Sequence, residues 1–321
     1  MNSLDISTIA QQLRSSRVFE GKRSIRKVST HFSKEQNSIR NGDDAAAIPD
    51  GDGYLLLAAE GIVPDIVKSN PYLAGRCAVL TNVNDIYSMG GRPTALVNII
   101  GAGEDETAAA ICRGISDNAA RYQLPVVGGH ILRIGSGGPT LAAAILGRAR
   151  RLITSFDALP GDRLVLVSGP RGHWLAEYGF WNCTLEEDDE ALVANLDLIP
   201  QASEMELVKA GKDVSMAGIA GTAVMLAEGS GVGMRLDLEH ISPPDGVDLV
   251  PWMLAYFSYG FLLSVHPAKL DDLRSLFFKQ QLTVATIGSV QPGSEVLLVN
   301  GSSQAMLWDW KKEPFTGFGH S

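Results

Sequence analysis

The chain has 321 residues, of which 45% are hydrophobic and 20% are charged, so it has the composition of a globular protein with room for two domains. A formal net charge of −9 argues against a general nucleic-acid binder, because phosphate backbones are bound by clustered lysine and arginine. No stretch is long enough to span a bilayer and no signal-peptide pattern is present, so we expect a cytoplasmic protein without a membrane partner.

The three cysteines are widely spaced and show no zinc-binding pattern, which favours reduced thiols. Cys77 and Cys112 fall in apolar helical patterns. We therefore expect both side chains to pack in the core or against a helix.

The first half of the chain alternates strands and helices. It begins with helix formers and a basic cluster at residues 4–28, which is either a solvated face or an arm over a phosphate site. The apolar spacing that follows predicts strands at 54–59, 94–100 and 139–150 and helices at 72–89 and about 104–122. The run Leu141–Leu146 is apolar throughout, so we expect its strand to be buried on both faces.

The stretch from Pro125 to Gly129 predicts a strand that runs into a glycine turn. His130 would project from that turn, where bare backbone N–H groups of Gly128 and Gly129 could meet an anion. A lone histidine is more often structural, and that alternative stays open.

A polar connection at 153–162 suggests a boundary between domains at 1–152 and 153–321. The second half again alternates strands and helices. Its segment Asp213–Thr222 precedes a predicted helix, and Gly218 and Gly221 there either let a helix N-terminus approach a phosphate or allow close packing. The tail from Trp308 onward either folds back across a cleft or is disordered.

The stretch Asn41–Ile48 contains adjacent carboxylates, Asp43 and Asp44, after Gly42. Because neighbouring side chains of an extended chain point to opposite faces, one carboxylate would face a cleft and the other a backbone or supporting group. Oxygen ligands of this kind suit Mg²⁺, which bridges to phosphates, but Gly-Asp-Asp also forms solvated turns.

Asp85 lies on a mostly apolar predicted helix, directly after Asn84. A carboxylate in such a place needs a partner or a ligand. Asp85 is therefore either a metal or catalytic group or a buried hydrogen-bonding residue.

Three motifs occur in an order and spacing that resembles the aminoimidazole ribonucleotide synthetase (PurM-like) superfamily. They are Gly42–Ala46, Asn84–Pro93 and Val127–His130. A fourth segment, Asp213–Gly233, resembles the glycine-rich segment that opens the C-terminal domain of thiamine-monophosphate kinase. The superfamily also includes selenide water dikinase, the hydrogenase maturation protein HypE and formylglycinamidine ribonucleotide synthetase.

The resemblance implies a two-domain α/β (α+β) fold, with an N-terminal domain that forms a dimeric β-barrel with its mate and a C-terminal α/β domain. It further implies a homodimer that binds ATP with Mg²⁺ and acts on a small-molecule acceptor. Carried over by motif, the metal carboxylates are Asp43, Asp44 and Asp85, with Asp85 and His130 in catalysis. The same motifs place Gly42, Asp43, Asp44, Asn84, Gly128, Gly129, Gly218 and Gly221 at the nucleotide.

The chain departs from the kinase pattern in two places. Leu55-Leu56 stands where the kinase carries Thr-Asp, and Met216-Ala217 stands where it carries Asp-Gly. It also lacks the catalytic cysteine or selenocysteine segment of selenide water dikinase and the C-terminal cysteine of HypE. These departures predict a divergent branch, with an unidentified acceptor whose pocket we expect around residues 168–174 and 181–182.

Three functions remain open from the sequence. The first is an ATP-dependent phosphoryl-transfer enzyme, with a thiamine-monophosphate kinase-like activity as a variant of it. The second is a nucleotide-binding protein without catalysis, and the third is a dimeric scaffold.

Overall fold

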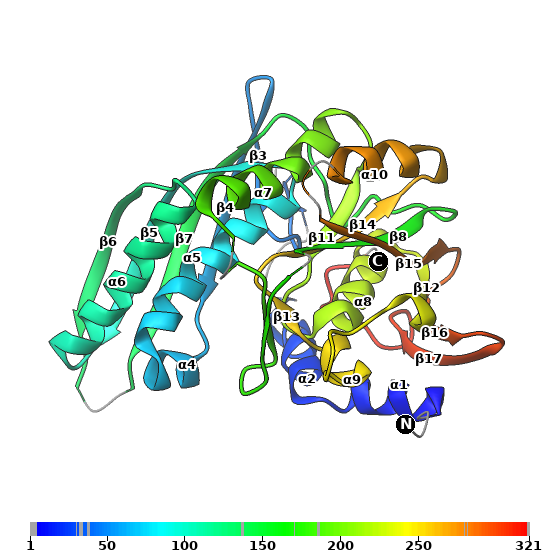
Figure 1. Cartoon of the computed structure of the whole chain (residues 1–321), viewed down its shortest axis with the longest axis horizontal. Helices are drawn as coiled ribbons and strands as arrows, with labels where there is room; N and C mark the ends of the chain where they lie inside the picture. Colours follow the sequence, from blue (N-terminus) through cyan, green and yellow to red (C-terminus); the bar gives the residue numbers. More distant parts are fainter. Residues whose placement is uncertain are drawn as a thin grey trace. The chain divides into compact units, whose positions relative to one another are not determined.

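A computed structural model describes residues 5–29, 31, 35–36, 39–135, 138–169, 171–184, 187–278, 280 and 282–319. These residues belong to two compact units, both of mixed α/β structure, which confirms the predicted fold class (Figure 1). The smaller unit comprises Asp44–Leu152 and Glu187–Gln201, and the larger comprises Met1–Asp43, Ile153–Glu186 and Ala202–Ser321. No helix in the described ranges is long and apolar enough to cross a membrane.

The smaller unit is built on a five-stranded sheet in the order β3-β4-β7-β5-β6. All neighbouring strands are antiparallel except the parallel pair β5 and β6. The strands are β3 (Ala46–Asp50), β4 (Gly53–Gly61), β5 (Arg92–Ala102), β6 (Val126–Arg133) and β7 (Thr140–Ala149). The helices are α4 (Pro64–Ser69), α5 (Pro71–Ser88) and α6 (Asp105–Arg121).

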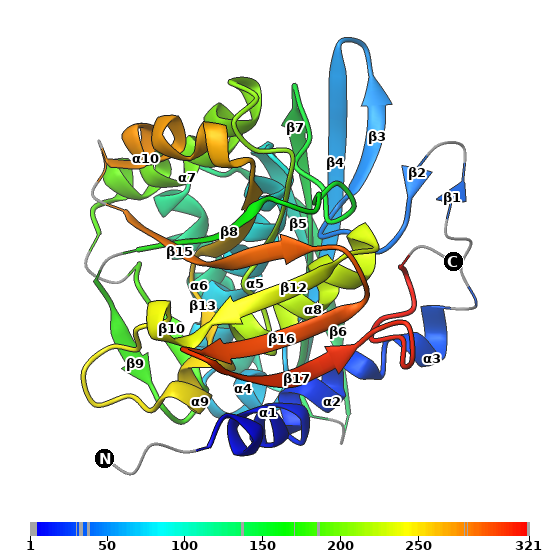
Figure 2. The same cartoon turned by 90° about the vertical axis from the view of Figure 1, so that its right-hand side faces the viewer.

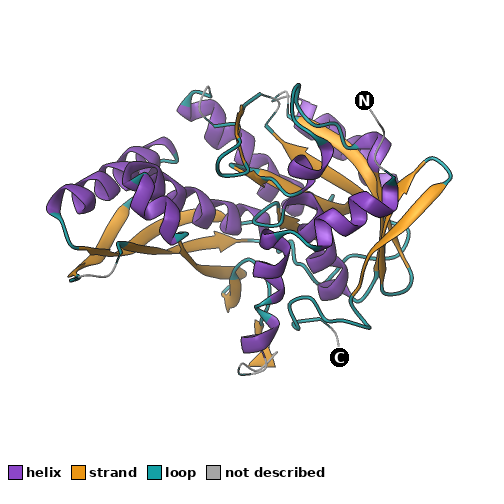
Figure 3. Cartoon of the chain, turned by 90° about the horizontal axis from the view of Figure 1, so that it is seen from below, coloured by secondary structure: helices purple, strands orange, loops and turns teal. Residues whose placement is uncertain are grey.

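Helices α5 and α6 cover one face of this sheet and leave the other face bare (Figure 3). Two glycines let these helices pack closely: a Cβ at Gly75 would lie 2.2 Å from the Ile111 carbonyl oxygen, and one at Gly114 would lie 2.1 Å from the Tyr72 carbonyl oxygen. Both helices thus present a smooth backbone surface to each other.

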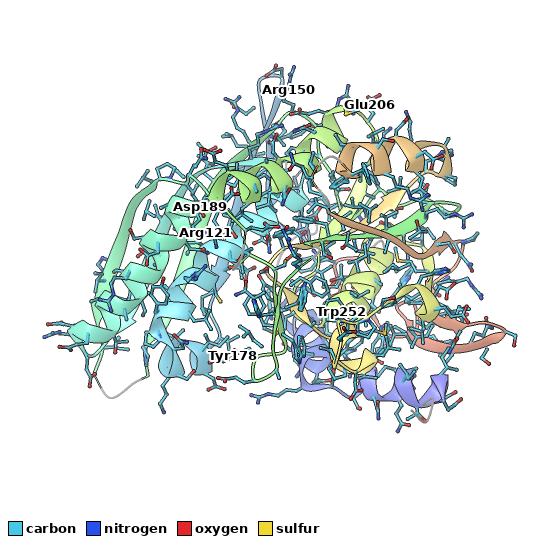
Figure 4. All side chains as sticks on the ribbon, viewed as in Figure 1. Arg121, Arg150, Tyr178, Asp189, Glu206 and Trp252 are labelled. Carbon is cyan, nitrogen blue, oxygen red and sulfur yellow. The ribbon has the colours of Figure 1, made fainter. Side chains whose placement is uncertain are left out.

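Residues 187–201, which contain the start of α7 (Asp189–Glu204), are tied to the smaller unit by ion pairs. Arg92 Nε lies 2.5 Å from Asp197 Oδ1, and Arg121 Nε lies 2.7 Å from Asp189 Oδ1. Figure 4 labels Arg121 and Asp189.

The larger unit is built on a seven-stranded sheet in the order β11-β14-β8-β15-β12-β16-β17, with α8 packed on one face (Figure 2). Its strands are β8 (Arg163–Ser168), β11 (Ala210–Asp213), β12 (Gly233–Asp237), β14 (Gly260–Val265), β15 (Thr283–Gln291), β16 (Glu295–Asn300) and β17 (Ser303–Asp309). A second sheet, ordered β13-β10-β9, contains β9 (His173–Leu175), β10 (Phe180–Asn182) and β13 (Tyr256–Phe257). The short strands β1 (Glu35–Gln36) and β2 (Ile39–Arg40) pair with each other.

The helices of the larger unit are mostly short, apart from α7 and α8. They are α1 (Ile6–Arg14), α2 (Arg17–Arg23), α3 (Arg26–Ser29), the end of α7, α8 (Gly218–Ser230), η1 (Leu238–His240), α9 (Leu249–Met253), η2 (Pro267–Lys269) and α10 (Leu270–Phe278).

The compact units depart from the predicted ranges 1–152 and 153–321 in two segments. Residues 1–43 belong to the larger unit, where α1 packs against β16 and β17, and residues 187–201 belong to the smaller unit. Both differences come from contacts between segments distant in sequence. Between these two segments the chain passes from the smaller unit to the larger unit at Leu152–Ile153.

Three local predictions were wrong. The predicted glycine turn at 128–129 is absent, because β6 runs without interruption through His130 and is paired along β5. We expected both faces of β7 to be buried, but buried residues alternate along it with more exposed ones, because helices cover only one face of the sheet. Cys112 is exposed on α6, so its apolar neighbours in sequence did not place it in the core.

Candidate functional site

The Asp44 and Asp85 carboxylates lie together in the smaller unit. Asp44 sits in the turn before β3 and is half-buried, and Asp85 lies in the last turn of α5 and is buried. An oxygen of each carboxylate lies within 4.8 Å of the other. The Ser88 hydroxyl donates to Asp44 Oδ2 at 2.7 Å and lies 2.9 Å from the Asp85 carbonyl oxygen, so it links the loop to the helix.

The helix α5 carries an unusual number of buried polar side chains near its C-terminal end. Asn82, Asn84, Asp85 and Ser88 are all buried, with Asn82, Asp85 and Ser88 three residues apart on one side of the helix. Asn82 donates through Nδ2 to the Ala78 carbonyl oxygen, but its buried Oδ1 accepts no hydrogen bond from any residue that the structure describes. Buried polar groups destabilise a fold unless they are satisfied, which points to a polar or ionic ligand here.

These side chains fit a hard divalent cation such as Mg²⁺. The two carboxylates offer oxygens within 4.8 Å of each other, whereas two oxygens that bind one Mg²⁺ at about 2.1 Å lie at most about 4.2 Å apart, so a shift of no more than about 0.6 Å brings both to one ion. Asp44 and Asp85 are the side chains that could hold such an ion.

Asp43 has different partners from Asp44, as the alternation along an extended chain predicts. Within the larger unit its carboxylate accepts hydrogen bonds from the Ser155 backbone N–H at 3.0 Å and from the Ser155 hydroxyl. Asp43 therefore anchors the loop through which the chain passes from one unit to the next. The structure brings Asp44 and Asp85 together and uses Asp43 in this second role.

Gly42 is a glycine for two reasons. Its φ of 104° is in the left-handed region, and a Cβ there would lie 2.3 Å from Phe318 Cβ. The C-terminal tail thus packs against the first residue of the Gly-Asp-Asp motif. Through residue 319 the tail is part of the folded larger unit, which excludes the predicted alternative of a disordered tail for these residues.

The tail is held by a buried carboxylate of α8. Glu228 accepts the backbone N–H groups of Phe315, Thr316 and Gly317 at 2.8, 2.7 and 3.2 Å, and the Thr316 hydroxyl at 2.6 Å. Phe315 is buried against Phe19 and Trp308, with ring centroids 4.8 and 5.4 Å away. No local sequence pattern marks Glu228, because its partners are nearly ninety residues away.

His130, Gly128 and Gly129 lie on β6, at the edge of the five-stranded sheet. His130 pairs with Ile99 of β5 and shares with it the bare face of the sheet, opposite the helices that carry Asp85. Gly129 lies on the helix-facing side, where a Cβ would come within 2.8 Å of Asn98 Oδ1. Among the described residues no hydrogen bond or ion pair joins His130 to Asp44 or Asp85.

Gly218 and Gly221 begin α8 in the larger unit. A Cβ at Gly218 would lie 2.4 Å from the Met253 carbonyl oxygen, and one at Gly221 would lie 2.4 Å from Ala217 Cβ. These contacts give close packing as a sufficient reason for both glycines. Ala217, which stands where the kinase pattern has glycine, adopts φ 78°, a strained conformation for alanine of the kind that clusters at functional sites.

Asp213, at the end of β11, is a buried carboxylate within the glycine-rich segment and was not among the predicted site residues. The sequence signal that could have identified it is an aspartate at the end of a buried strand, because a buried carboxylate needs a partner or a ligand.

The predicted acceptor pocket is only partly accessible. Trp181 is buried on β10 and packs edge-on against Trp252 at 5.4 Å, and Asn182 accepts a hydrogen bond from the Thr184 hydroxyl at 3.0 Å. The segment at 173–175 forms β9, and Arg171 and His173 are exposed. Pro170 lies outside the described residues.

Two family models match most of the chain. One, described as AIR synthase related protein, N-terminal domain, covers residues 42–149, and the other, AIR synthase related protein, C-terminal domain, covers residues 160–299. The chain belongs to the AIR synthase related family. The superfamily predicted from four short motifs is therefore confirmed.

Relatives of this chain include proteins of similar length. It is 46% identical over 282 residues to the uncharacterized protein sll0787 of Synechocystis, covering 88% of this chain and 87% of that one. It is 28% identical over 289 residues to selenide, water dikinase of Aeromonas hydrophila, covering 83% and 80% of the two chains. A solved thiamine monophosphate kinase from Aquifex aeolicus shares the fold, with a TM-score of 0.61 and 20% identity over 82% of this chain and 92% of that one.

Within this family the chain has one apolar replacement that the structure explains. Leu56, where the kinase pattern has aspartate, is fully buried, and its Cδ1 packs so closely on Gly91 that a Cβ there would lie 2.3 Å away. Position 56 is thus part of the core of the smaller unit. A metal ligand has no place there in this chain.

Proposed function

We propose that this protein binds ATP with Mg²⁺ and transfers a phosphoryl group to a small molecule, working as a homodimer. The observation that carries the proposal is the Asp44–Asp85 pair, two carboxylates joined through Ser88 at the end of a helix with buried polar side chains. Relatives named selenide, water dikinase and a structural relative described as AaThiL complexed with AMPPCP and TMP support a nucleotide phosphate as the ligand.

In this proposal Asp44 and Asp85 hold the cation, which would neutralise charge on the phosphates. Ser88 orients Asp44, and Asp43 fixes the approach of the loop by its bonds to Ser155. Asn84 is buried beside Asp85 and would line the site, as would the backbone near Gly42.

The bare face of the five-stranded sheet supports a homodimer. Leu57, Val97, Ile99 and Leu146 lie on this face, and Leu57 and Ile99 are 49% and 53% exposed. Leu57 pairs with Leu146 in the antiparallel register, so these side chains are neighbours. A contiguous apolar face of this kind marks an interaction surface. His130 lies on the same face and would be covered in the dimer. Its proposed catalytic role therefore requires that His130 of one copy reach the nucleotide bound by the other copy.

The test is Mg²⁺-ATP binding by calorimetry, with ADP formation measured in parallel. We expect Asp85→Asn and Asp44→Asn to weaken Mg²⁺-ATP binding roughly tenfold or more, since each removes a ligand charge. Asp65→Asn is the matched control, because it removes the same charge from an exposed position of α4 in the same unit. Unchanged Mg²⁺-ATP affinity in both site variants would contradict the proposal.

A second candidate, nucleotide binding without turnover, is favoured by Leu56 in the core. It predicts the same loss of binding in Asp85→Asn but no ADP release from the wild type with any acceptor tried. The two functions are therefore separated by the ADP measurement, while the binding measurement tests what they share.

A further inference from the structure

A basic hollow lies on the uncovered face of the seven-stranded sheet, within the larger unit. Strands β15, β12, β16 and β17 lie side by side with α8 behind them (Figure 2). The hollow has a volume of about 530 Å³ and is lined by Arg163 of β8, Arg235 of β12 and Arg274 of α10. This volume is in the usual range for sites of small molecules.

The hollow exists because β15 presents small side chains to this face. Ala285, Gly288 and Ser289 line it, and the pairing of β15 with β8 shifts register between Thr286 and Gly288. At Gly288 the backbone of β12 comes so close that a Cβ would lie 2.0 Å from the Arg235 carbonyl oxygen. A larger residue cannot replace this glycine without moving a strand, so the floor of the hollow is fixed by backbone packing.

The one carboxylate of the lining already has partners. Asp237 accepts the Glu239 backbone N–H at 3.1 Å through Oδ1, and its Oδ2 lies 3.0 Å from His240 Nδ1. Among the described residues Asp237 therefore makes no ion pair with the arginines of the lining, and their charges are not neutralised by it. Arg235 donates to the neutral side-chain oxygen of Gln304 at 3.1 Å.

The other two arginines also retain hydrogen-bonding capacity. Arg274 donates to the Thr286 hydroxyl at 3.1 Å and lies 3.5 Å from the exposed Asp271. Arg163 makes no ion pair with any residue that the structure describes. In a chain with net charge −9, three guanidinium groups around one hollow are a local reversal of sign, and an anion would relieve their mutual repulsion.

We propose that this hollow binds a small molecule that carries phosphate groups, with Arg163 and Arg235 as its main contacts. Guanidinium groups bind phosphate oxygens through paired hydrogen bonds, and the Ser289 and Thr286 hydroxyls line the same hollow. Neither Asp44 nor Asp85 lines this hollow, so the proposal does not depend on the proposed enzymatic function.

The experiment titrates the full chain with inorganic pyrophosphate by calorimetry, at low ionic strength and with EDTA in place of Mg²⁺. We expect one pyrophosphate per chain, and binding at least about tenfold weaker in the double variant Arg163→Gln, Arg235→Gln. The control Arg14→Gln, Arg17→Gln removes the same charge from exposed positions of α1 and α2 and should change affinity less than about twofold. Ser289→Leu keeps every charge but fills the hollow, so it should also abolish binding.

Parallel titrations with inorganic phosphate and with metal-free ATP identify the source of the phosphate group. Tighter binding of either one, with the same dependence on Arg163 and Arg235, would support the site and name its ligand class. Absence of binding by the wild type with all three probes at millimolar concentration would overturn the proposal. Equal weakening by the control pair, or unchanged binding in Ser289→Leu, would overturn it as well.

Discussion

Replacement of Glu228 by glutamine tests how the C-terminal tail is held. In the native protein four donors from residues 315–317 converge on the two carboxylate oxygens. Glutamine keeps one oxygen but turns an NH₂ group toward the donors on the other side, which leaves the Thr316 N–H and hydroxyl without an acceptor. A buried donor without a partner costs about 1–3 kcal/mol, so we expect Glu228→Gln to lower the free energy of unfolding by about 2–4 kcal/mol.

The assay is urea unfolding followed by circular dichroism and by tryptophan fluorescence, since Trp308 contacts Phe315 at a ring distance of 5.4 Å. Thr316→Val is the matched control: it removes only the hydroxyl donor and should cost about 1 kcal/mol. Stability of Glu228→Gln within about 0.5 kcal/mol of the wild type would refute the reasoning, because surface substitutions alone have effects of that size. In that case the aromatic contacts of Phe315 would hold the tail by themselves.

Three further outcomes are expected. Iodoacetamide at neutral pH should modify exposed Cys112 well before Cys77. Burial raises the pKa of the Cys77 thiol to about 11, and the nearby Arg76 charge lowers that pKa by a smaller amount. Mass spectrometry that finds Cys77 labelled first would contradict this expectation. Ile99→Glu should convert the proposed homodimer to monomer in analytical ultracentrifugation, whereas an unchanged mass would remove the bare sheet face from the interface. Burial alone would raise the pKa of Asp309, but hydrogen bonds from Lys312 and Ser294 outweigh it and hold that pKa below its ordinary value. Its contribution to stability is therefore present above about pH 4 and lost as the pH falls through the lowered pKa, so unfolding of Asp309→Asn should depend less on pH there.

The chain order of helices and strands follows from local patterns. The helix at 72–89 was predicted by its apolar spacing and its closing glycines, and α5 occupies Pro71–Ser88. Asp85 was singled out because a carboxylate on such a helix needs a partner. The alternation of Asp43 and Asp44 was predicted in the same way, and the two side chains do have different partners.

Long-range packing decided what the sequence alone could not. His130 was expected to project from a turn, but pairing with β5 from Gly128 to Arg133 keeps β6 extended past the two glycines. Leu146 belongs to an apolar run and is nevertheless exposed, because helices cover only one face of its sheet. The role of Glu228 depends on backbone donors nearly ninety residues away.

By itself, therefore, the sequence determined the α/β class, the order of the elements and the residue types capable of binding a divalent cation, because these follow from side-chain chemistry and from periods of two and 3.6 residues. Only the tertiary structure decided that Asp44 meets Asp85 while Asp43 serves Ser155, and that the tail closes on Glu228. Such contacts depend on which distant segments the sheets bring together, and the free energy that selects them is spread over many side chains that no single motif contains.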